Sequence, residues 1–196
     1  MKKLLMAVSA AAIVAAAPAS AQTLSTGNTL TYNVSAEVGV ICGVYNAAGT
    51  SIDVNFNELA TVAEGTEIQR PAGSASYRCN DADGFTRTIY SQNGGTLNRV
   101  GTTGGANNSI VYDFQHGGGS GLGLAKGRLP TQSAAPGQNF NGSTAFLNGQ
   151  TGSVNFFVRG VFNTNGNGTG SNNEAPGTTV FAGNYTDVVT IAVTAR

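Results

Sequence analysis

The sequence contains no tryptophan, and only ten acidic and ten basic residues occur among its 196 positions. After Lys2 and Lys3 the only lysine is Lys126. A nucleic-acid-binding protein usually carries a basic stripe, and this chain shows none. Two cysteines and one histidine leave little material for a metal centre, so we expect neither a metal nor another cofactor. Glycine, with 28 residues, and asparagine are abundant, and both favour turns over helices.

The first 21 residues have the three parts of a secretory signal peptide. Lys2 and Lys3 precede an apolar run at 4–17, and Ala19-Ser20-Ala21 forms a small-x-small cleavage site. The apolar run is too short to span a bilayer. We therefore expect export and a mature chain of roughly 175 residues, enough for one domain with a real core.

The two cysteines, Cys42 and Cys79, are predicted to form one disulfide. An even number of cysteines in an exported protein most simply indicates a disulfide. The alternatives are a metal pair or a redox site, but the chain has no C-x-x-C motif and a single histidine. A bond closing this loop would stabilise the fold by about 3–4 kcal/mol through chain entropy.

Short segments of alternating apolar residues occur along most of the chain, which is typical of half-buried strands. They are SIDVNFN (51–57), SASYRC (74–79), FTRTIYS (85–91), SIVYDFQ (109–115) and SVNFFVRGVF (153–162). Glycine-rich and Asn-Gly stretches separate them, including 116–123 and 163–173. The weakly helical segment 57–69 is broken by Gly65, so we expect a loop or a single turn there. Short strands with frequent turns predict an all-β sandwich or barrel.

Three features could carry chemistry, and each has a simpler interpretation. The loop GGGSGLG lacks the spacing of a phosphate-binding motif, and no helix is predicted after it. His116 lies near Asp113, but no serine or cysteine is tied to it by a recognised spacing, so we expect a solvated loop histidine. Asp81 and Asp83 alternate as calcium ligands can, yet a polar turn also explains them. We therefore expect no enzyme and no metal site.

The stretch after the predicted cleavage site is too long for one strand. Alternate positions from Leu24 to Cys42 are mostly apolar. Strands in soluble domains usually run about 3–10 residues, and this pattern covers roughly twice that length. At the other end of the chain, Tyr185, Val189, Ile191 and Val193 predict one strand over 185–195, with Asp187 near its start and nothing after it to pair.

These features together resemble the spore coat protein U family and the pilins of archaic chaperone–usher fimbriae. The resemblance is carried by the signal peptide, the long alternating stretch before Cys42, YRCN at 77–80, KGRLPTQ at 126–132, and FAGNYTDVVTIAVTA at 181–195. It covers the mature chain in outline. Cys42 and Cys79 also fall where the disulfide of that family would lie.

The resemblance implies an immunoglobulin-like sandwich that lacks its last strand. A periplasmic chaperone would cover the resulting groove, and the N-terminal extension of the next subunit would then replace the chaperone strand. Residues 22–33 would be the donor, with a pilin domain at 34–196 that begins its own first strand near Val34. The donor side chains would be Leu24, Thr26, Asn28, Leu30 and Tyr32, and the acceptor strand would present Tyr185, Val189, Ile191 and Val193.

The implied function is a structural subunit of a surface fimbria that serves adhesion or biofilm formation. Its partners would be identical or related subunits joined head to tail, the chaperone and an outer-membrane usher. It would pass through the periplasm to the cell surface. Two other interpretations stay open: a secreted monomeric module that binds carbohydrate or another surface ligand, and a spore- or cyst-coat component.

Overall fold

A computed structural model of the chain describes residues 31–163 and 176–196. Contacts divide the chain into two units, Met1–Glu37 and Val38–Arg196, and every described strand lies in the second. The predicted signal peptide and the predicted donor residues Leu24, Thr26, Asn28 and Leu30 lie outside the described residues. No helix in the described ranges is both long and apolar enough to cross a bilayer.

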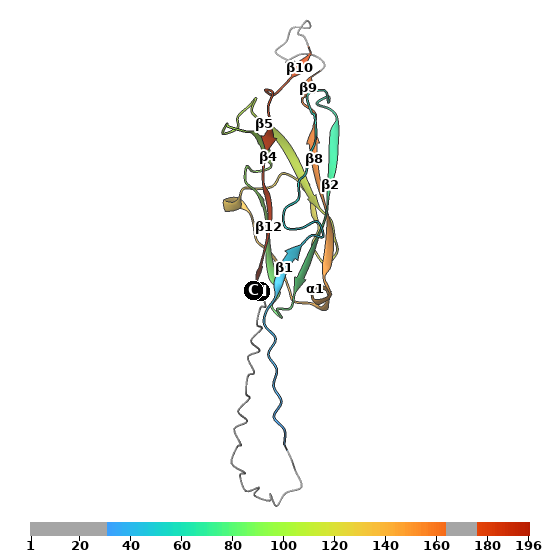
Figure 1. Cartoon of the computed structure of the whole chain (residues 1–196), viewed down its shortest axis with the longest axis vertical. Helices are drawn as coiled ribbons and strands as arrows, with labels where there is room; N and C mark the ends of the chain where they lie inside the picture. Colours follow the sequence, from blue (N-terminus) through green and yellow to red (C-terminus); the bar gives the residue numbers. More distant parts are fainter. Residues whose placement is uncertain (1–30, 164–175) are drawn as a thin grey trace, which may run out of the picture. The chain divides into compact units, whose positions relative to one another are not determined.

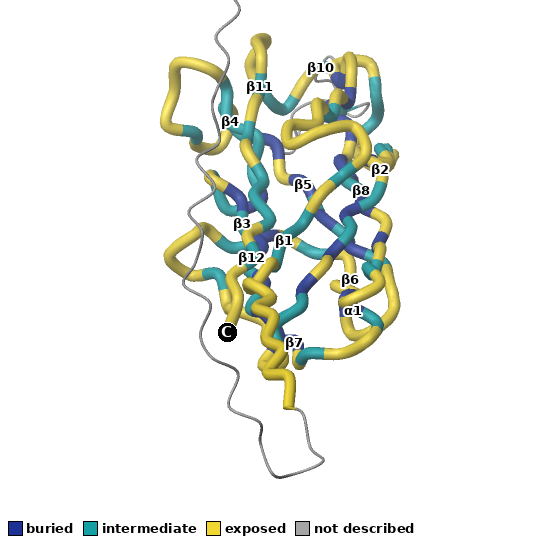
Figure 2. Tube along the Cα trace, turned by 60° about the horizontal axis from the view of Figure 1, so that its bottom comes forward, coloured by how far each residue is buried: buried dark blue, intermediate teal, exposed yellow. Residues whose placement is uncertain are grey.

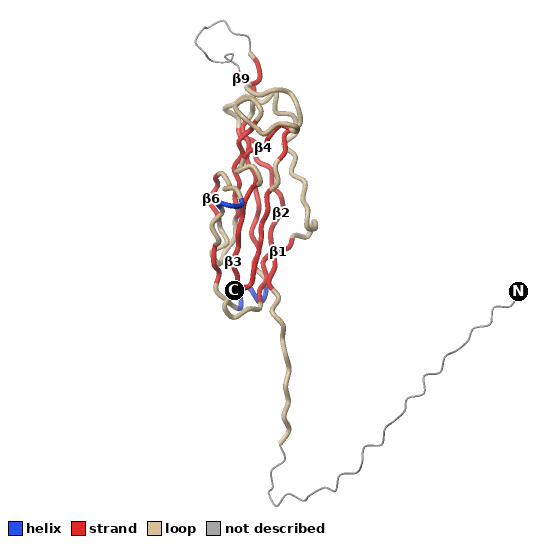
Figure 3. Tube along the Cα trace, turned by 90° about the vertical axis from the view of Figure 1, so that its left-hand side faces the viewer, coloured by secondary structure: helices blue, strands red, loops and turns tan. Residues whose placement is uncertain are grey.

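The second unit is built almost entirely from strands and their connecting loops (Figure 3). The strands are β1 (Cys42–Tyr45), β2 (Glu67–Cys79), β3 (Phe85–Ser91), β4 (Thr96–Arg99), β5 (Ser109–His116), β6 (Leu124–Gly127), β7 (Gln138–Phe140), β8 (Gln150–Arg159), β9 (Phe162–Asn163), β10 (Gly177–Thr178), β11 (Tyr185–Thr186) and β12 (Val189–Ala195). The helical elements are the 3-10 turn η1 (Gln132–Ala134) and the short helix α1 (Thr144–Asn148).

Two antiparallel sheets form the body of this unit (Figure 1). The larger has the order β1-β2-β8-β5-β4-β11, with β6 also pairing with β5. The smaller has the order β12-β3-β7, and β9 and β10 form a separate ribbon. This arrangement confirms the predicted all-β class, and two facing antiparallel sheets are the layout of an immunoglobulin-like sandwich.

Aromatic side chains from both sheets fill the space between them. The ring of Phe85 on β3 lies 6.1 Å from Tyr77 on β2, 4.9 Å from Phe140 on β7 and 4.9 Å from Phe146 on α1, between ring centroids. All four residues are buried. Offset and edge-on contacts of this kind add to the free energy gained from apolar burial. The aromatic cluster therefore joins β3 and β7 of the smaller sheet to β2 of the larger sheet and to α1.

The predicted strand at 51–57 is not a strand in the structure. Val54 and Phe56 do point inward, Val54 onto the main core and Phe56 into a second cluster. The backbone of the segment, however, has no ladder partner. The alternation therefore indicates burial for Val54 and Phe56 but not for Ile52, which is exposed, and the hydrogen-bonded neighbour that defines a strand is missing. The next segment, 57–69, is loop and turn as expected up to Thr66, and β2 begins at Glu67.

The first strand also begins later than predicted. Residues 31–41 carry no strand, and β1 starts at Cys42 instead of near Val34. Cys42 lies directly opposite Cys79, the last residue of β2, so pairing begins where the larger sheet first offers a neighbour. The alternation before Cys42 continues without a strand partner in this part of the chain.

Candidate functional site

The last strand of the chain has a neighbour on one side only. β12 pairs with β3 along its whole length, from Val189 opposite Ser91 to Ala195 opposite Phe85. No described strand pairs with its other edge, which we call the open edge. β1 stands at the end of the larger sheet and pairs only with β2. β1 and β12 contact each other, and Figures 1 and 2 show them side by side.

Apolar side chains at these two edges are only half-buried, although they pack against the main core. Central strands of the same sandwich hold fully buried residues such as Phe85 and Phe114. Ala192 and Thr194 on β12 alternate with the inward residues and are exposed. We call the inward set the half-buried patch; it consists of Cys42 and Val44 on β1 and Val189, Ile191 and Val193 on β12. The core is therefore incompletely covered where the sheets meet.

The predicted C-terminal strand is divided into two strands that belong to different sheets. β11 pairs with β4 of the larger sheet, whereas β12 pairs with β3 of the smaller one. Tyr185 therefore packs against the second apolar cluster, and its hydroxyl donates a hydrogen bond of 2.6 Å to the Phe181 carbonyl. The structure brings Val189, Ile191 and Val193 together and places Tyr185 on the other sheet. The reason is the chain crossing at Asp187 and Val188.

Asp187 anchors this crossing. Its carboxylate accepts hydrogen bonds from the Tyr112 hydroxyl (2.7 Å) and the Ser91 hydroxyl, and also from the backbone N–H groups of Asn93 (3.0 Å) and Val188 (2.8 Å). Tyr112 lies on β5 of the larger sheet and Ser91 on β3 of the smaller. Burial, with a further contribution from the Asp187 charge, raises the pKa of Tyr112, so its phenol stays protonated and donates. One carboxylate thus links both sheets at the start of β12.

The disulfide between Cys42 and Cys79 is present and joins β1 to β2. Asn80, the residue after it, continues the attachment: its side chain accepts from the Ile41 N–H (2.6 Å) and donates to the Gly39 carbonyl (2.8 Å). The Asn80 N–H also donates to the Ile41 carbonyl, at 3.1 Å. Asn80 is the last residue of the YRCN motif, and local sequence pattern alone predicts no role for it. Together these bonds hold residues 39–42 against the end of β2.

The N-terminal residues that precede this anchor are exposed where they are described. Tyr32, the one predicted donor residue within the described range, is exposed, and so is Val34. Among the residues leading into β1, Val38, Val40 and Ile41 are exposed as well. Exposure of several large apolar side chains in one short segment is unusual for a monomeric protein.

His116 is a core residue, which corrects the prediction of a solvated loop histidine. It ends β5 and is 1% exposed. Its Nδ1 lies 2.6 Å from the Gly117 carbonyl and its Nε2 lies 2.9 Å from the Tyr77 hydroxyl. The carbonyl can only accept, which assigns the proton to Nδ1 and the acceptor role to Nε2. Burial lowers the pKa of His116, and its two ring nitrogens are both engaged by these partners and not by Asp113.

The other chemical candidates also have structural roles. The Asp81 carboxylate accepts from the Asp83 N–H at 2.9 Å, and the Asp81 carbonyl accepts from the Gly84 N–H, so this segment is a polar turn. In the described ranges no three acidic, histidine or cysteine side chains gather closely enough to hold a metal ion.

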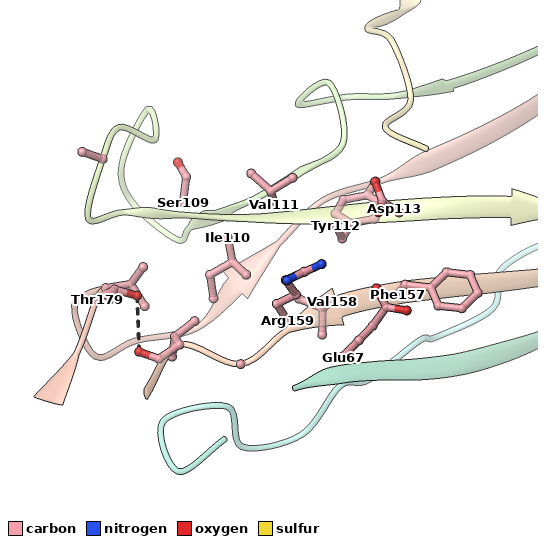
Figure 4. A pocket seen from close by; sticks show the side chains of 14 residues that line it. Glu67, Ser109, Ile110, Val111, Tyr112, Asp113, Phe157, Val158, Arg159 and Thr179 are labelled. Atoms are coloured by element: carbon pink, nitrogen blue, oxygen red, sulfur yellow. Dashed lines mark hydrogen bonds between the residues drawn. The ribbon is translucent and has the colours of Figure 1, made fainter. Parts of the chain in front are cut away.

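A shallow cavity of about 270 Å³ lies where β5 and β8 diverge (Figure 4). Glu67, Asp113 and Arg159 are among its lining residues, with apolar residues such as Ile110. Glu67 is engaged by an ion pair with Lys126, and the Ser109 hydroxyl donates to Asn98 at 3.0 Å.

Comparisons with known proteins found similarity to solved structures alone. No protein-family profile matches the chain, and no curated protein matches it. A solved chaperone–tip adhesin complex, described as vital for synergistic activation of CFA/I fimbriae biogenesis, is similar at 13% sequence identity and a TM-score of 0.40. The match covers 79% of this chain and 42% of that chain, so this chain spans less than half of the other's length. A likeness of this size carries no functional argument.

Proposed function

We propose that the protein is a structural subunit of a surface fimbria, assembled head to tail by donation of a strand from one subunit to the next. The observation that carries the proposal is the open edge of β12, which lies beside β1 and above apolar residues that are only half-buried. The resemblance to archaic pilins rests on sequence motifs alone, and it also implies an open edge at this strand.

An open edge of this kind favours a partner for two physical reasons. Its backbone N–H and C=O groups can form ladder hydrogen bonds with an added strand, and such edges are an aggregation hazard when left bare. The added strand would also cover the half-buried patch. Each apolar side chain that it removed from water would contribute to affinity at about 25 cal/mol per Å².

The occupant would change as the subunit matures. A periplasmic chaperone would cover the open edge after export, and an outer-membrane usher would direct its replacement by the N-terminal extension of the next subunit. Donation from one subunit to a neighbour is a heterologous contact, which produces an open filament when it does not close into a ring. The fibre would then serve adhesion or biofilm formation at the cell surface.

The two alternative functions predict that the protein would occur in a different form at the cell surface. A secreted monomeric module would leave the open edge bare or close it within one chain, and the cavity between β5 and β8 would be its binding site. A coat component would share the fold but would stay attached to the spore or cyst.

Electrophoresis of surface extracts, boiled and unboiled, tests the proposal. We expect a ladder of SDS-resistant oligomers without boiling and a single monomer band after it, and we expect the ladder-forming material to be released by shearing. A monomer band in both lanes would contradict the proposal and favour the binding module. Protein that resists shearing and stays with the cell body would instead favour the coat component.

A further inference from the structure

One leucine fastens the glycine-rich loop between β5 and β6 to the core. The loop, residues 117–123, contains five glycines, and most of its residues are exposed. Leu122 is the exception, because its side chain is fully buried in the main core. The Arg87 guanidinium donates to the Leu122 carbonyl at 2.9 Å, and the Gln138 amide donates to the Gly121 carbonyl at 3.1 Å. A few contacts thus keep closed a segment whose glycines favour many other conformations.

Arg87 brings a buried positive charge to this contact. It is 1% exposed, and its guanidinium lies over the rings of Tyr77, at 5.5 Å, and Phe140, at 5.1 Å. The hydrogen-bond acceptors of this guanidinium, the Leu122 carbonyl and the Gln138 side chain, are neutral. Within residues 31–163 and 176–196 no carboxylate forms an ion pair with Arg87. A second positive charge beside it would therefore be strongly unfavourable.

His116 contacts the same tyrosine and the start of the same loop. Its Nε2 accepts from the Tyr77 hydroxyl, and its Nδ1 donates to the Gly117 carbonyl. A proton on Nε2 would deprive the Tyr77 hydroxyl of this acceptor and would add a second cation near Arg87. The charged and titratable side chains that act on the ring are Tyr77 from β2 and Arg87 from β3, and neither supplies a negative charge. The loop presents only carbonyl groups to the ring.

The imidazole ring has no room to move toward β8. A Cβ atom at Gly152 would lie 2.3 Å from His116 Cε1 and 2.7 Å from its Nδ1, so the ring already packs against the β8 backbone. The same atom would lie 2.0 Å from the Gly117 carbonyl oxygen, where the loop begins. Opening of the loop would admit water to the protonated ring without separating the strands of either sheet. The loop is therefore the neighbour that can yield when His116 becomes charged.

We propose that the glycine-rich loop is an acid-released latch, in which protonation of His116 opens residues 117–123 while both sheets stay folded. This inference goes beyond the fimbrial function and does not depend on it. In the open form the ring is in water, where its pKa takes the ordinary value of 6.5. Proton uptake by the open form should raise the ratio of open to closed molecules by up to about tenfold between pH 7.5 and pH 5.5.

Hydrogen exchange at single-residue resolution on the purified full-length protein tests the latch. The probe is the Leu122 N–H, which donates to the Gly119 carbonyl at 3.0 Å within the loop. The reference is the Gly95 N–H, which lies outside the loop and donates to the buried Ser91 hydroxyl at 2.7 Å. Protection factors, corrected for the intrinsic exchange rate at each pH, are compared at pH 7.5 and pH 5.5, with and without a low concentration of urea.

We expect the Leu122 protection factor to fall about tenfold from pH 7.5 to pH 5.5. It should not depend on urea, because a local opening exposes little surface, whereas the Gly95 protection factor should fall with urea. A Leu122 protection factor that is the same at both pH values would overturn the latch. So would one that falls with urea as steeply as that of Gly95, because the opening would then be unfolding of the whole domain.

Three variants identify the parts of the latch. His116→Gln removes the titrating group, so the protection of the Leu122 N–H should be equal at both pH values; a tenfold fall in this variant would contradict the role of His116. Leu122→Ala removes the buried side chain and should lower the protection of the amide at position 122 at pH 7.5 already. Ser120→Ala is the matched control in the same loop, since Ser120 is exposed, and it should respond to pH as wild type does.

Discussion

The Tyr112 hydroxyl on β5 donates a 2.7 Å hydrogen bond to Asp187, the residue at which the chain leaves one sheet and joins the other. The same carboxylate accepts from Ser91 on β3, so both sheets hold the crossing in place. Because β12 begins two residues later, this contact fixes where the open edge starts. The position of the candidate assembly site therefore depends on a polar contact between residues 75 positions apart in the sequence.

Asp187→Asn should destabilise the subunit. The asparagine amide would keep one acceptor oxygen, but its NH₂ group could not accept hydrogen bonds as the second carboxylate oxygen does. A hydrogen bond lost in this way costs about 1–3 kcal/mol. Chemical denaturation of the purified subunit would measure the change. Asp53→Asn is the control, since Asp53 is exposed, and it should change stability by less than about 0.5 kcal/mol. Equal denaturation midpoints for Asp187→Asn and wild type would refute the anchoring role.

Ile191→Asp should remove the exported protein. Ile191 packs against the main core from β12, and an unpaired charge there costs several kcal/mol. The unfolded subunit would be degraded, so immunoblots of whole cells should show little protein. Thr194→Asp adds the same charge to the exposed face of β12 and should accumulate normally. Wild-type amounts of the Ile191→Asp protein would show that this face of β12 is not part of the core.

The disulfide should be complete in the exported protein. Intact-mass measurement after alkylation without reduction should detect no modified thiol, because Cys42 and Cys79 are the only cysteines. Replacing both with serine should lower the free energy of unfolding by about 3–4 kcal/mol in the chain-entropy description. Two alkylated thiols in the non-reduced protein would contradict the bond.

Mild acid should weaken the fold through His116. Its folded pKa lies below the ordinary value of 6.5 because the ring is buried, and the Arg87 charge acts in the same direction. The unfolded chain therefore takes up the proton first, so this contribution to stability is full above pH 6.5 and falls as the pH drops from there toward the folded pKa. The slope can reach at most about 1.4 kcal/mol per pH unit.

Denaturation midpoints between pH 8 and 5.5 would measure this effect, since His116 is the only histidine in the chain. His116→Gln should be less stable at pH 8 but should show a flatter pH dependence than wild type over this range. Two charged or titratable groups act on the imidazole ring, the Tyr77 hydroxyl and the Arg87 guanidinium. The pKa of Tyr77 is raised by burial, so this hydroxyl stays neutral over the pH range tested. If the denaturation midpoint depended on pH equally in wild type and in His116→Gln, a group other than His116 would cause the acid sensitivity.

Much of the strand content followed from local patterns in the sequence. FTRTIYS was predicted as a strand and forms β3 with the same bounds, and SIVYDFQ lies within β5. The pairing of Cys42 with Cys79 needed only the cysteine count and the predicted export. The alternation of Val189, Ile191 and Val193 likewise indicated which face of the last strand meets the core. The strand patterns depend on which side chains avoid water, and the order of apolar and polar residues along the chain determines this.

The tertiary structure alone decided which strands have neighbours. The segments at 24–42 and 51–57 alternate as clearly as β3 does, yet the described residues 31–41 carry no strand before β1 begins at Cys42, and 51–57 forms no ladder. The division of 185–195 at Asp187, the burial of His116 and the bonds of Asn80 were likewise absent from local patterns. Each depends on hydrogen bonds between residues 39 or more positions apart. Alternation records which face of a segment is apolar, but the partner that completes its backbone hydrogen bonds is chosen only when the sheets pack together.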